Sequence, residues 1–568
     1  MARVDAMSEE SSPERPSGAR FVALGILVSR VFGLVRQVAI GRFFGVAAHA
    51  DVWQTALRLP NAIQNLLGEQ SLSAGFIPVY SRLLAEGRRD DAARFAGAAF
   101  ALLAAAVGAA AVAGVVFARP LVAIGAAGFL RDAARVAAGE IDVDRFELTV
   151  RVVRVIFPMT AFLALGAWAL GVLNSHRRFL LPYVAPVAWN VAIVTALCGA
   201  AAPAGLLFHP EDAGLAVLDR WLLAAAWGAL LGGALQFLVQ LPAVLRLMGG
   251  LRLTWRPLAV PGVREALRAF GPALLGRGVV QISMYVSVVL ASFLHAGAPA
   301  ALNFAVILIN LPMHAFGTSV AAAELPEMSR LTPEELGPRL SERLGRALRQ
   351  AGFVICPSVV GYLFFGYLVA GLLFRGGRFG PEGNVLVAVV LAGYALGMLA
   401  STASRLLQNT FFALRDTRTP ARVAAWRLAV DAGLGVALMA WLDRYPVAGT
   451  SGDGDGLYFG AAGLAAAASV GAWFELALLR RRLRERIADL RLPARRLARL
   501  AALAAACALP SLLLWALLPP SLPVRAQALV ALPLYPLLYL GFAWWRSSPE
   551  LAMWLGGLGR RRGRPGTG

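Results

Sequence analysis

Apolar blocks long enough to cross a lipid bilayer recur along most of this chain of 568 residues. A hydrocarbon core about 30 Å thick requires roughly 20 residues of helix. A window of about 19 residues places about fourteen such blocks between residues 20 and 546. The blocks are rich in Leu and Ala and lack the two-residue alternation of barrel strands. The sequence therefore predicts an all-α polytopic membrane protein with about fourteen transmembrane helices.

The basic residues, which are all arginines, concentrate in alternate loops between the blocks. The stretches 480–499 and 559–566 are the densest, whereas the intervening loops 209–214 and 449–456 are neutral or acidic. Lys and Arg are enriched in cytoplasmic loops, so this asymmetry predicts that both termini are cytoplasmic. The net charge of +21 is then explained by arginines that anchor the topology beside anionic headgroups. The alternative is that these arginines bind a specific partner. Nothing in the sequence supports nucleic acid as that partner.

Enzymatic chemistry has little support in this sequence. The three cysteines lie in apolar blocks, and the five histidines are scattered without metal-ligand spacing. No Walker loop is present, and no loop is long enough to form a soluble domain; the longest outer loop, 119–147, has room for one interfacial helix. We expect a non-enzymatic protein without a cofactor, whose function is performed inside the helix bundle.

Seven arginines interrupt the apolar blocks. An ionised group at mid-bilayer costs several kcal/mol, so such groups face a protein interior or a water-filled cavity and are candidates for function. Arg42 is set apart from them because it lies near the end of its block, where a long side chain reaches the interface. The candidates are Arg30, Arg36, Arg58, Arg151, Arg154, Arg277 and Arg405.

Arg30 and Arg36 lie on one predicted helix with Gly33 midway between them. Six residues of helix turn through about 600°, so the two side chains diverge by about 120° and flank a groove with glycine at its floor. Two guanidinium groups in this arrangement suit bidentate binding of a phosphate. The alternative is that each arginine bonds to neighbouring carbonyls or carboxylates.

The second block carries a polar stripe. Asp51, Arg58, Asn65 and Glu69 follow one another at intervals of seven, seven and four residues, which places them on one face of a helix. Pro60 interrupts the backbone ladder and predicts a kink. We interpret this block as the polar wall of a cavity; the alternative is that Asp51 and Glu69 only neutralise the first-helix arginines.

Two later positions extend this interpretation. Arg277, with Gln281 and Ser283, forms a polar face in the seventh block, and Asp431 is an isolated carboxylate in the eleventh that is a candidate ligand for Na⁺ or a proton. A cationic cavity between kinked helices suits an anionic substrate that crosses the bilayer by alternating access.

Several segments resemble the MurJ/MviN family of lipid II flippases, in the multidrug/oligosaccharidyl-lipid/polysaccharide exporter superfamily. The resemblance rests on SRVFGLVRQVAIGRFFG (29–45), ADVWQTALRLPN and GFIPVYS in the first two blocks, and on segments 171–190, 372–380 and 404–421 at later junctions. These segments occur in order over almost the entire chain.

The resemblance implies a specific architecture. Two six-helix lobes, 20–246 and 264–480, form an inverted V, and helices in 497–546 form a groove for a lipid tail. A disordered tail, 1–19, precedes them, and a basic cytoplasmic tail, 547–568, follows them.

The resemblance also implies a substrate, an undecaprenyl-diphosphate-linked glycopeptide moved from the cytoplasmic to the periplasmic leaflet. It further implies that the membrane is a bacterial inner membrane. Arg30, Arg36, Asp51, Arg58 and Glu69 match positions that the family uses in its cavity. We expect Na⁺, H⁺ or Cl⁻ as a coupling ion, and membrane lipids and the cell-wall synthesis machinery as partners.

This chain departs from the family pattern at several cavity positions. Gln64 or Asn65, and Ile307, stand where basic residues are common, and Gln37 stands where an acid is common. These departures leave open an exporter of another lipid-linked oligosaccharide, such as an O-antigen or exopolysaccharide unit. A cation-coupled drug exporter, a scaffold for cell-wall enzymes and a membrane glycosyltransferase fit the arginines and short loops less well.

Overall fold

The computed structural model of this protein describes residues 17–67, 69–268, 285–313, 338–414, 416–449, 456–487, 490, 492–546, 548 and 550–551. Within these residues the fold is helical, and the helices form two groups that we call the first and second lobes.

The first lobe is formed by the chain up to residue 268. Its helices are α1 (Ser17–Phe44), α2 (Ala48–Leu67), α3 (Glu69–Ala85), α4 (Arg89–Val116), α5 (Ala118–Gly125), η1 (Ala127–Arg131), α6 (Asp132–Ala137), α7 (Arg145–Ile156), α8 (Met159–Ser175), α9 (Leu180–Val184), α10 (Pro186–Ala201), η2 (Ala202–Ala204), η3 (Pro210–Asp212), α11 (Leu215–Leu238), α12 (Leu241–Met248) and η4 (Pro257–Ala259).

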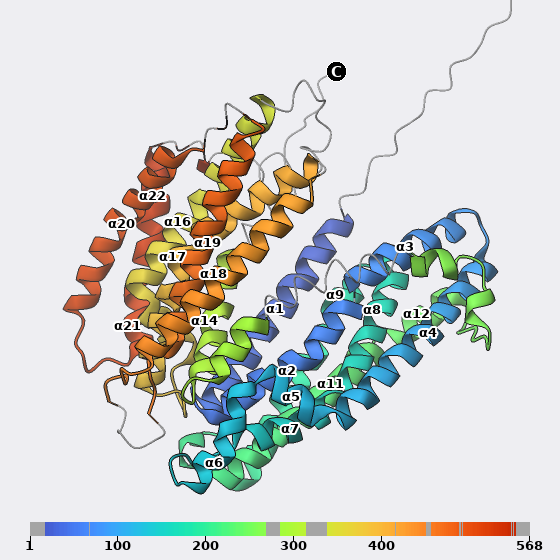
Figure 1. Ribbon diagram of the computed structural model, residues 1–568, viewed down its shortest axis with the longest axis horizontal. Coiled ribbons are helices and arrows are strands. Elements are labelled where there is room, and N and C mark those ends of the chain that lie inside the picture. The colour runs from blue at the N-terminus through green and yellow to red at the C-terminus, as the bar shows by residue number, and fades with distance from the viewer. Residues whose placement is uncertain are drawn as a thin grey trace, which may run out of the picture.

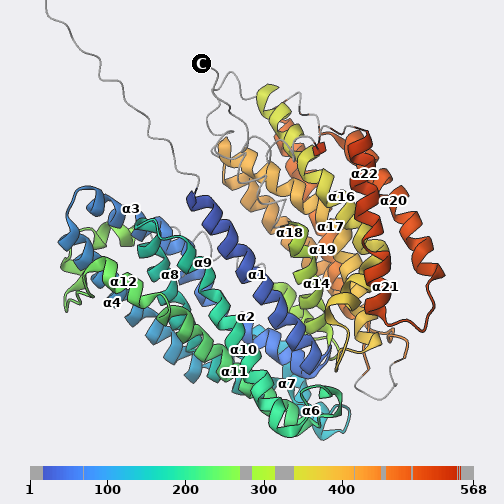
Figure 2. The ribbon, with the colours of Figure 1, turned by 180° about the vertical axis from the view of Figure 1, so that it is seen from behind.

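The second lobe contains fewer and longer helices. They are α14 (Ala298–Pro312), α16 (Pro338–Phe374), α17 (Pro381–Ala413), α18 (Arg418–Leu442), α19 (Gly460–Arg484), α20 (Ala494–Leu517), α21 (Val524–Ala531) and α22 (Leu534–Trp545). Helices α20 to α22 pack on α16, on the side of the second lobe away from the first (Figure 2).

The two lobes meet at one end and diverge toward the other (Figure 1). We call the meeting end, where α2 and α14 begin, the junction end; the opposite end, where α1 begins and α22 finishes, is the terminal end. One buried hydrophobic cluster contains side chains of both lobes, including Phe43, Trp221, Phe304 and Phe379, whereas the remaining clusters each belong to one lobe. The apolar contact that joins the lobes is therefore concentrated near the junction end.

The predicted membrane-spanning class is confirmed, although the exact number of spans stays a prediction. Among the described residues, eleven helical segments are long and apolar enough to cross a membrane, and α14 is a shorter apolar helix. Three of the fourteen predicted blocks have no counterpart among these eleven segments. Blocks 264–295 and 299–329 include residues that the structure does not describe, and block 51–82 is divided between α2 and α3. Proline separates other paired helices, as where Pro158 stands between α7 and α8, because proline has no backbone N–H to continue the ladder.

The predicted outer loop 119–147 is more structured than one interfacial helix. It contains most of α5, then η1 and α6, and it lies at the junction end beside the start of α14. Two residues of this region, Asp132 and Arg145, complete a buried ionic network.

Candidate substrate path and lobe junction

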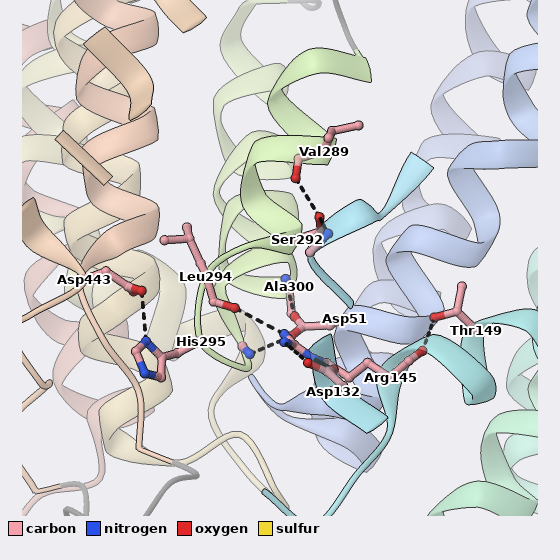
Figure 3. Close-up of polar contacts among 12 residues, drawn as sticks. Asp51, Asp132, Arg145, Thr149, Val289, Ser292, Leu294, His295, Ala300 and Asp443 are labelled. Carbon is pink, nitrogen blue, oxygen red and sulfur yellow. Dashed lines mark hydrogen bonds and ion pairs between the residues drawn. The ribbon is translucent and has the colours of Figure 1, made fainter. Parts of the chain in front are cut away.

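Asp51, at the start of α2, holds the first turn of α14 in the other lobe (Figure 3). The Gly297 N–H donates to its Oδ2 atom at 2.7 Å, and the Ala300 N–H donates to its Oδ1 atom at 2.9 Å. The first N–H groups of a helix have no partner inside the helix, and the positive end of the helix dipole favours a carboxylate. Asp51 is fully buried, so this contact is an N-terminal cap supplied across the lobe junction.

Arg145 of the first lobe shares its positive charge between Asp51 and Asp132. Its Nη1 atom lies 3.5 Å from Asp51 Oδ2, and its Nε and Nη2 atoms donate to the two oxygens of Asp132 at 2.6 and 3.1 Å. The Leu294 carbonyl accepts a further hydrogen bond from Nη1 at 3.4 Å. All three charged side chains are buried, with exposures of 3% or less. We call Asp51, Asp132 and Arg145 the junction network.

Glycines allow the backbones of the two lobes to approach closely at this end. A Cβ atom added to Gly128 in η1 would lie 2.3 Å from the Ser292 carbonyl carbon and oxygen, and the Gly128 N–H donates to Ser292 Oγ at 2.9 Å. Gly297 has φ of +89°, a region that disfavours other residues, and a Cβ there would lie 2.8 Å from the Val46 carbonyl oxygen. The junction therefore depends on backbone shape as well as on charge.

The sequence interpretation placed Asp51 on a cavity wall and did not identify Asp132 or Arg145. In this conformation Asp51 has no exposed surface, so contact with a substrate requires the junction to open. Asp132 and Arg145 were missed because they lie outside the apolar blocks, where charges are expected to face water. Their signal was the opposite signs of the two charges within a short loop next to an apolar block.

Arg30 and Arg36 differ from the junction network because neither has an ion pair with any described residue. Arg30 is exposed midway along α1. Arg36 is half-buried, with its guanidinium carbon 4.4 Å from the centroid of the Trp189 ring of α10. Its Nε and Nη1 atoms are shielded from solvent and have no hydrogen-bond partner among the described residues. Shielded guanidinium donors of this kind can donate charge-assisted hydrogen bonds to an anion.

Arg58 connects the polar stripe of α2 with the second lobe. Its backbone carbonyl accepts a hydrogen bond from the Tyr285 hydroxyl at 2.5 Å, and its side chain lies within electrostatic range of the phenols of Tyr285 and Tyr394. Closer to the junction end, Gln54 Nε2 donates to Gln37 Oε1 at 3.4 Å and links α2 to α1. The substitution at Gln37 therefore replaces a charge with a neutral contact between the first two helices.

Further predicted site residues fall into two groups, those outside the described residues and those exposed elsewhere on the first lobe. The side chains of Asn65 and Glu69 and the whole of Arg277 lie outside the described residues. Arg151 and Arg154 on α7 are exposed.

Asp431 belongs to a second ionic cluster, inside the second lobe. Its Oδ2 atom lies 3.3 Å from Arg427 Nε, and Arg427 Nη1 lies 2.6 Å from Glu475 Oε2. Gln408 donates to the other Glu475 oxygen at 2.7 Å, and Arg405 lies within electrostatic range of Glu475. The sequence interpretation missed Glu475 and Arg427, although an arginine four residues before an isolated aspartate is a recognisable helical pair.

The comparisons with known proteins agree with this geometry. Residues 40–522 match the family described as "Lipid II flippase MurJ", a segment that begins after both first-helix arginines. The chain is 30% identical to "Lipid II flippase MurJ" of Burkholderia cenocepacia, over 75% of this chain and 77% of that protein. It is 31% identical to "Probable lipid II flippase MurJ" of Bdellovibrio bacteriovorus, over 74% of this chain and 76% of that protein.

Solved structures have the same fold. A lipid II flippase MurJ in an inward closed conformation matches with a TM-score of 0.68 at 18% identity, covering 92% of this chain and 99% of that one. An inward-facing transporter of the multidrug resistance MATE family matches with a TM-score of 0.57 at 13% identity, covering 83% of this chain and 98% of that one. At these identities the likeness shows the fold alone.

Proposed function

This chain belongs to the lipid II flippase MurJ family, and we propose that it moves lipid II from the cytoplasmic to the periplasmic leaflet by alternating access. It belongs to a transporter family rather than a catalytic one, and its membrane-spanning helices agree with that. The basic residues near the terminal end support a cytoplasmic location for both termini, so the junction end is periplasmic in this proposal.

The observation that carries the proposal is the shielded, unpartnered guanidinium of Arg36. Structural arginines inside apolar helices are paired, because an unpaired buried charge is costly. Arg36 instead has no partner for Nε and Nη1 among the residues that the structure describes, while its ring contact with Trp189 holds the group in place. A diphosphate supplies the negative charge and the acceptor oxygens that these donors lack.

The junction network keeps the lobes closed at the junction end until the substrate is released there. With Asp51 capping α14 and Arg145 paired with Asp51, the lobes are held together at the junction end while α1 stays exposed toward the terminal end. Release of the substrate on the junction side requires the cap to break and the lobes to rock.

The lipid tail is proposed to stay in the membrane beside α20 to α22. These helices expose a row of large apolar side chains, including Leu509, Leu513, Leu529 and Leu537, each 60% exposed or more. Such a surface suits acyl or prenyl chains.

Coupling to an ion remains a prediction of the sequence. The charges around Asp431 are balanced, since Arg427 and Arg405 face Asp431 and Glu475. Asp431 Oδ1 has no hydrogen-bond partner among the described residues and is the atom at which a proton or Na⁺ would bind. Replacing Asp431 with Asn and measuring transport against Na⁺ concentration and pH tests this role.

Lipid II exposure in the outer leaflet is the measurement that tests the function. Cells that depend on this protein should lose exposure of labelled lipid II when Arg36→Ala or Arg30→Ala is introduced, at unchanged protein level. Arg256→Ala, an exposed arginine in the loop after α12, is the matched control and should retain transport. Normal exposure with both first-helix arginines replaced would rule out the proposed path. Failure of the unmodified protein to support growth without another lipid II flippase would favour a different lipid-linked glycan.

A further inference from the structure

A pocket of about 420 Å³ lies between α18 and α19 near the terminal end, away from the proposed substrate path. Its size is within the range of ligand sites in proteins. Arg422 on α18 and Arg482 and Arg486 at the end of α19 line it, together with the apolar side chains of Trp426, Phe474 and Leu478.

On both helices, the arginines that line the pocket lie closer to the terminal end than the apolar side chains do. On α18, Trp426 lies one turn further from the terminal end than Arg422; on α19, Phe474 and Leu478 lie two turns and one turn further than Arg482. Trp426 is 64% exposed and Phe474 is 38% exposed. The pocket is thus cationic toward the terminal end and aromatic toward the middle of the bilayer.

The cationic part is only partly neutralised. Asp416 accepts from Arg486 at 2.6 Å, and Glu485 Oε2 lies 3.3 Å from Arg482 Nη1. Arg422 is exposed and makes no ion pair within the described part of the chain. Its charge is therefore available to a ligand.

A second pocket of about 430 Å³ adjoins the first through the shared residue Glu485. It is lined by Arg480, Arg481 and Arg484, and Arg480 Nε is shielded from solvent without a hydrogen-bond partner among the described residues. Positive charge gathered only to fix topology faces water and needs neither a pocket nor an aromatic wall. This arrangement matches a ligand with an anionic head and an apolar tail.

We propose that the groove between the terminal ends of α18 and α19 binds an anionic glycerophospholipid. Its phosphate contacts Arg422 and Arg482, and one acyl chain lies along Trp426 and Phe474. Basic pockets between membrane helices bind such headgroups through the same combination of charge and apolar contact. The proposal does not depend on lipid II as the substrate, and its leaflet follows from the proposed orientation.

Retention of phospholipid by the purified full-length protein tests the site. Phosphatidylglycerol and phosphatidylcholine with identical acyl chains are titrated in neutral detergent, and bound lipid is counted by native mass spectrometry. We expect phosphatidylglycerol to bind about tenfold more tightly, and R422Q/R482Q to remove that preference while leaving phosphatidylcholine binding unchanged. Arg486 is left in place because it holds Asp416, and Trp426→Ala, which keeps every charge, should weaken both lipids equally.

The matched control is R256Q/R264Q, which removes two exposed arginines from the segment of the first lobe that follows α12. It should leave the preference for phosphatidylglycerol intact. Equal binding of the two lipids by the unmodified protein, or an equal loss in the control, would overturn the proposal. Displacement of phosphatidylglycerol by inorganic phosphate at constant ionic strength would show a site for a free anion, and displacement by a polyglutamate peptide would show a site for an acidic protein segment; either would also overturn it. No lipid II is used, so none of these results bears on transport.

Discussion

The junction network and the first-helix arginines Arg30 and Arg36 both place charged side chains in the helix bundle. Of these side chains, only those of the network form ion pairs with described residues. Asp51, Asp132 and Arg145 pair with one another and Asp51 caps α14, whereas Arg36 has two shielded donor atoms without a partner among the described residues and Arg30 is exposed. A buried pair that loses one partner is strongly destabilised, so the network is expected to support the closed junction. Unused donors add nothing to folding, so Arg36 is expected to matter only when a ligand is present. The comparison separates residues that hold a conformation from residues that bind substrate.

The largest effect is expected from Arg145→Met. Removing the guanidinium leaves Asp51 and Asp132 as uncompensated buried charges, which should lower the free energy of unfolding by about 3–5 kcal/mol. Thermal unfolding of the purified protein in detergent measures this loss. Arg119→Met is the control, because Arg119 forms an exposed pair with Glu147 that contributes about 0–1 kcal/mol. Equal melting temperatures for the two variants would contradict the role of the network.

Arg36→Ala should impair transport while leaving stability nearly unchanged, in contrast to Arg145→Met. Transport should fall by about 100-fold because the diphosphate loses charge-assisted hydrogen bonds, while stability changes by less than about 1 kcal/mol. Arg36→Lys should recover only part of the activity, since an ammonium group lacks the planar fork and the stacking on Trp189. Lipid II exposure and thermal unfolding, measured on the same variants, give both readouts. A large loss of stability in Arg36→Ala would show that Arg36 holds the conformation and would contradict its role in binding substrate.

Asp51→Asn should destabilise only the closed state, in which Asp51 caps α14. Asparagine keeps one acceptor oxygen but places an NH₂ group against the N-terminus of α14, at a cost of about 1–3 kcal/mol. The junction should open more often, and labelling of a cysteine at Ala300 by an impermeant thiol reagent should rise about tenfold. The native cysteines are replaced in this background.

Asp219→Asn provides the control for that experiment. Asp219 lies 2.9 Å from His49, and both residues belong to the first lobe, so its loss should leave labelling unchanged. An equal increase in both variants would show that any carboxylate near this end affects opening.

The smallest effect is expected at Glu550, where a pair lies inside one lobe. Burial alone would raise its pKa, but two hydrogen bonds from Arg496 and one from Ser548 lower the pKa to about 2. A lowered pKa means that the stabilisation is complete above the unfolded pKa of about 4.3 and is lost as the pH falls through about 2. Glu550→Gln should therefore lose about 1 kcal/mol near neutral pH, and the difference from the unmodified protein should shrink below about pH 4.

Hydrogen exchange in α20 to α22 reports this local loss. Labelling of Ala300→Cys should not change, because both partners of the pair lie in the second lobe. An increase in that labelling would show that the C-terminal helices influence the junction.

The helical class and the candidate status of Arg36 were accessible to sequence reasoning. Hydropathy is a property of consecutive residues, and an arginine within an apolar block is visible without any tertiary information. The function of Asp51 was not accessible in this way. Its partner Gly297 is 246 residues away in the chain, and nothing in the local spacing distinguishes a carboxylate on a cavity wall from one that caps a distant helix.

Consecutive residues are enough to show that this chain crosses the membrane many times and carries arginines inside its helices. These features depend on local hydropathy and on the energetic cost of burying charge. The pairing of charges, in contrast, became visible only in the packed helices. Ion pairing depends on distances of a few ångströms between helices, and helix packing placed Arg145 beside Asp51 and left Arg36 without an ion pair among the described residues.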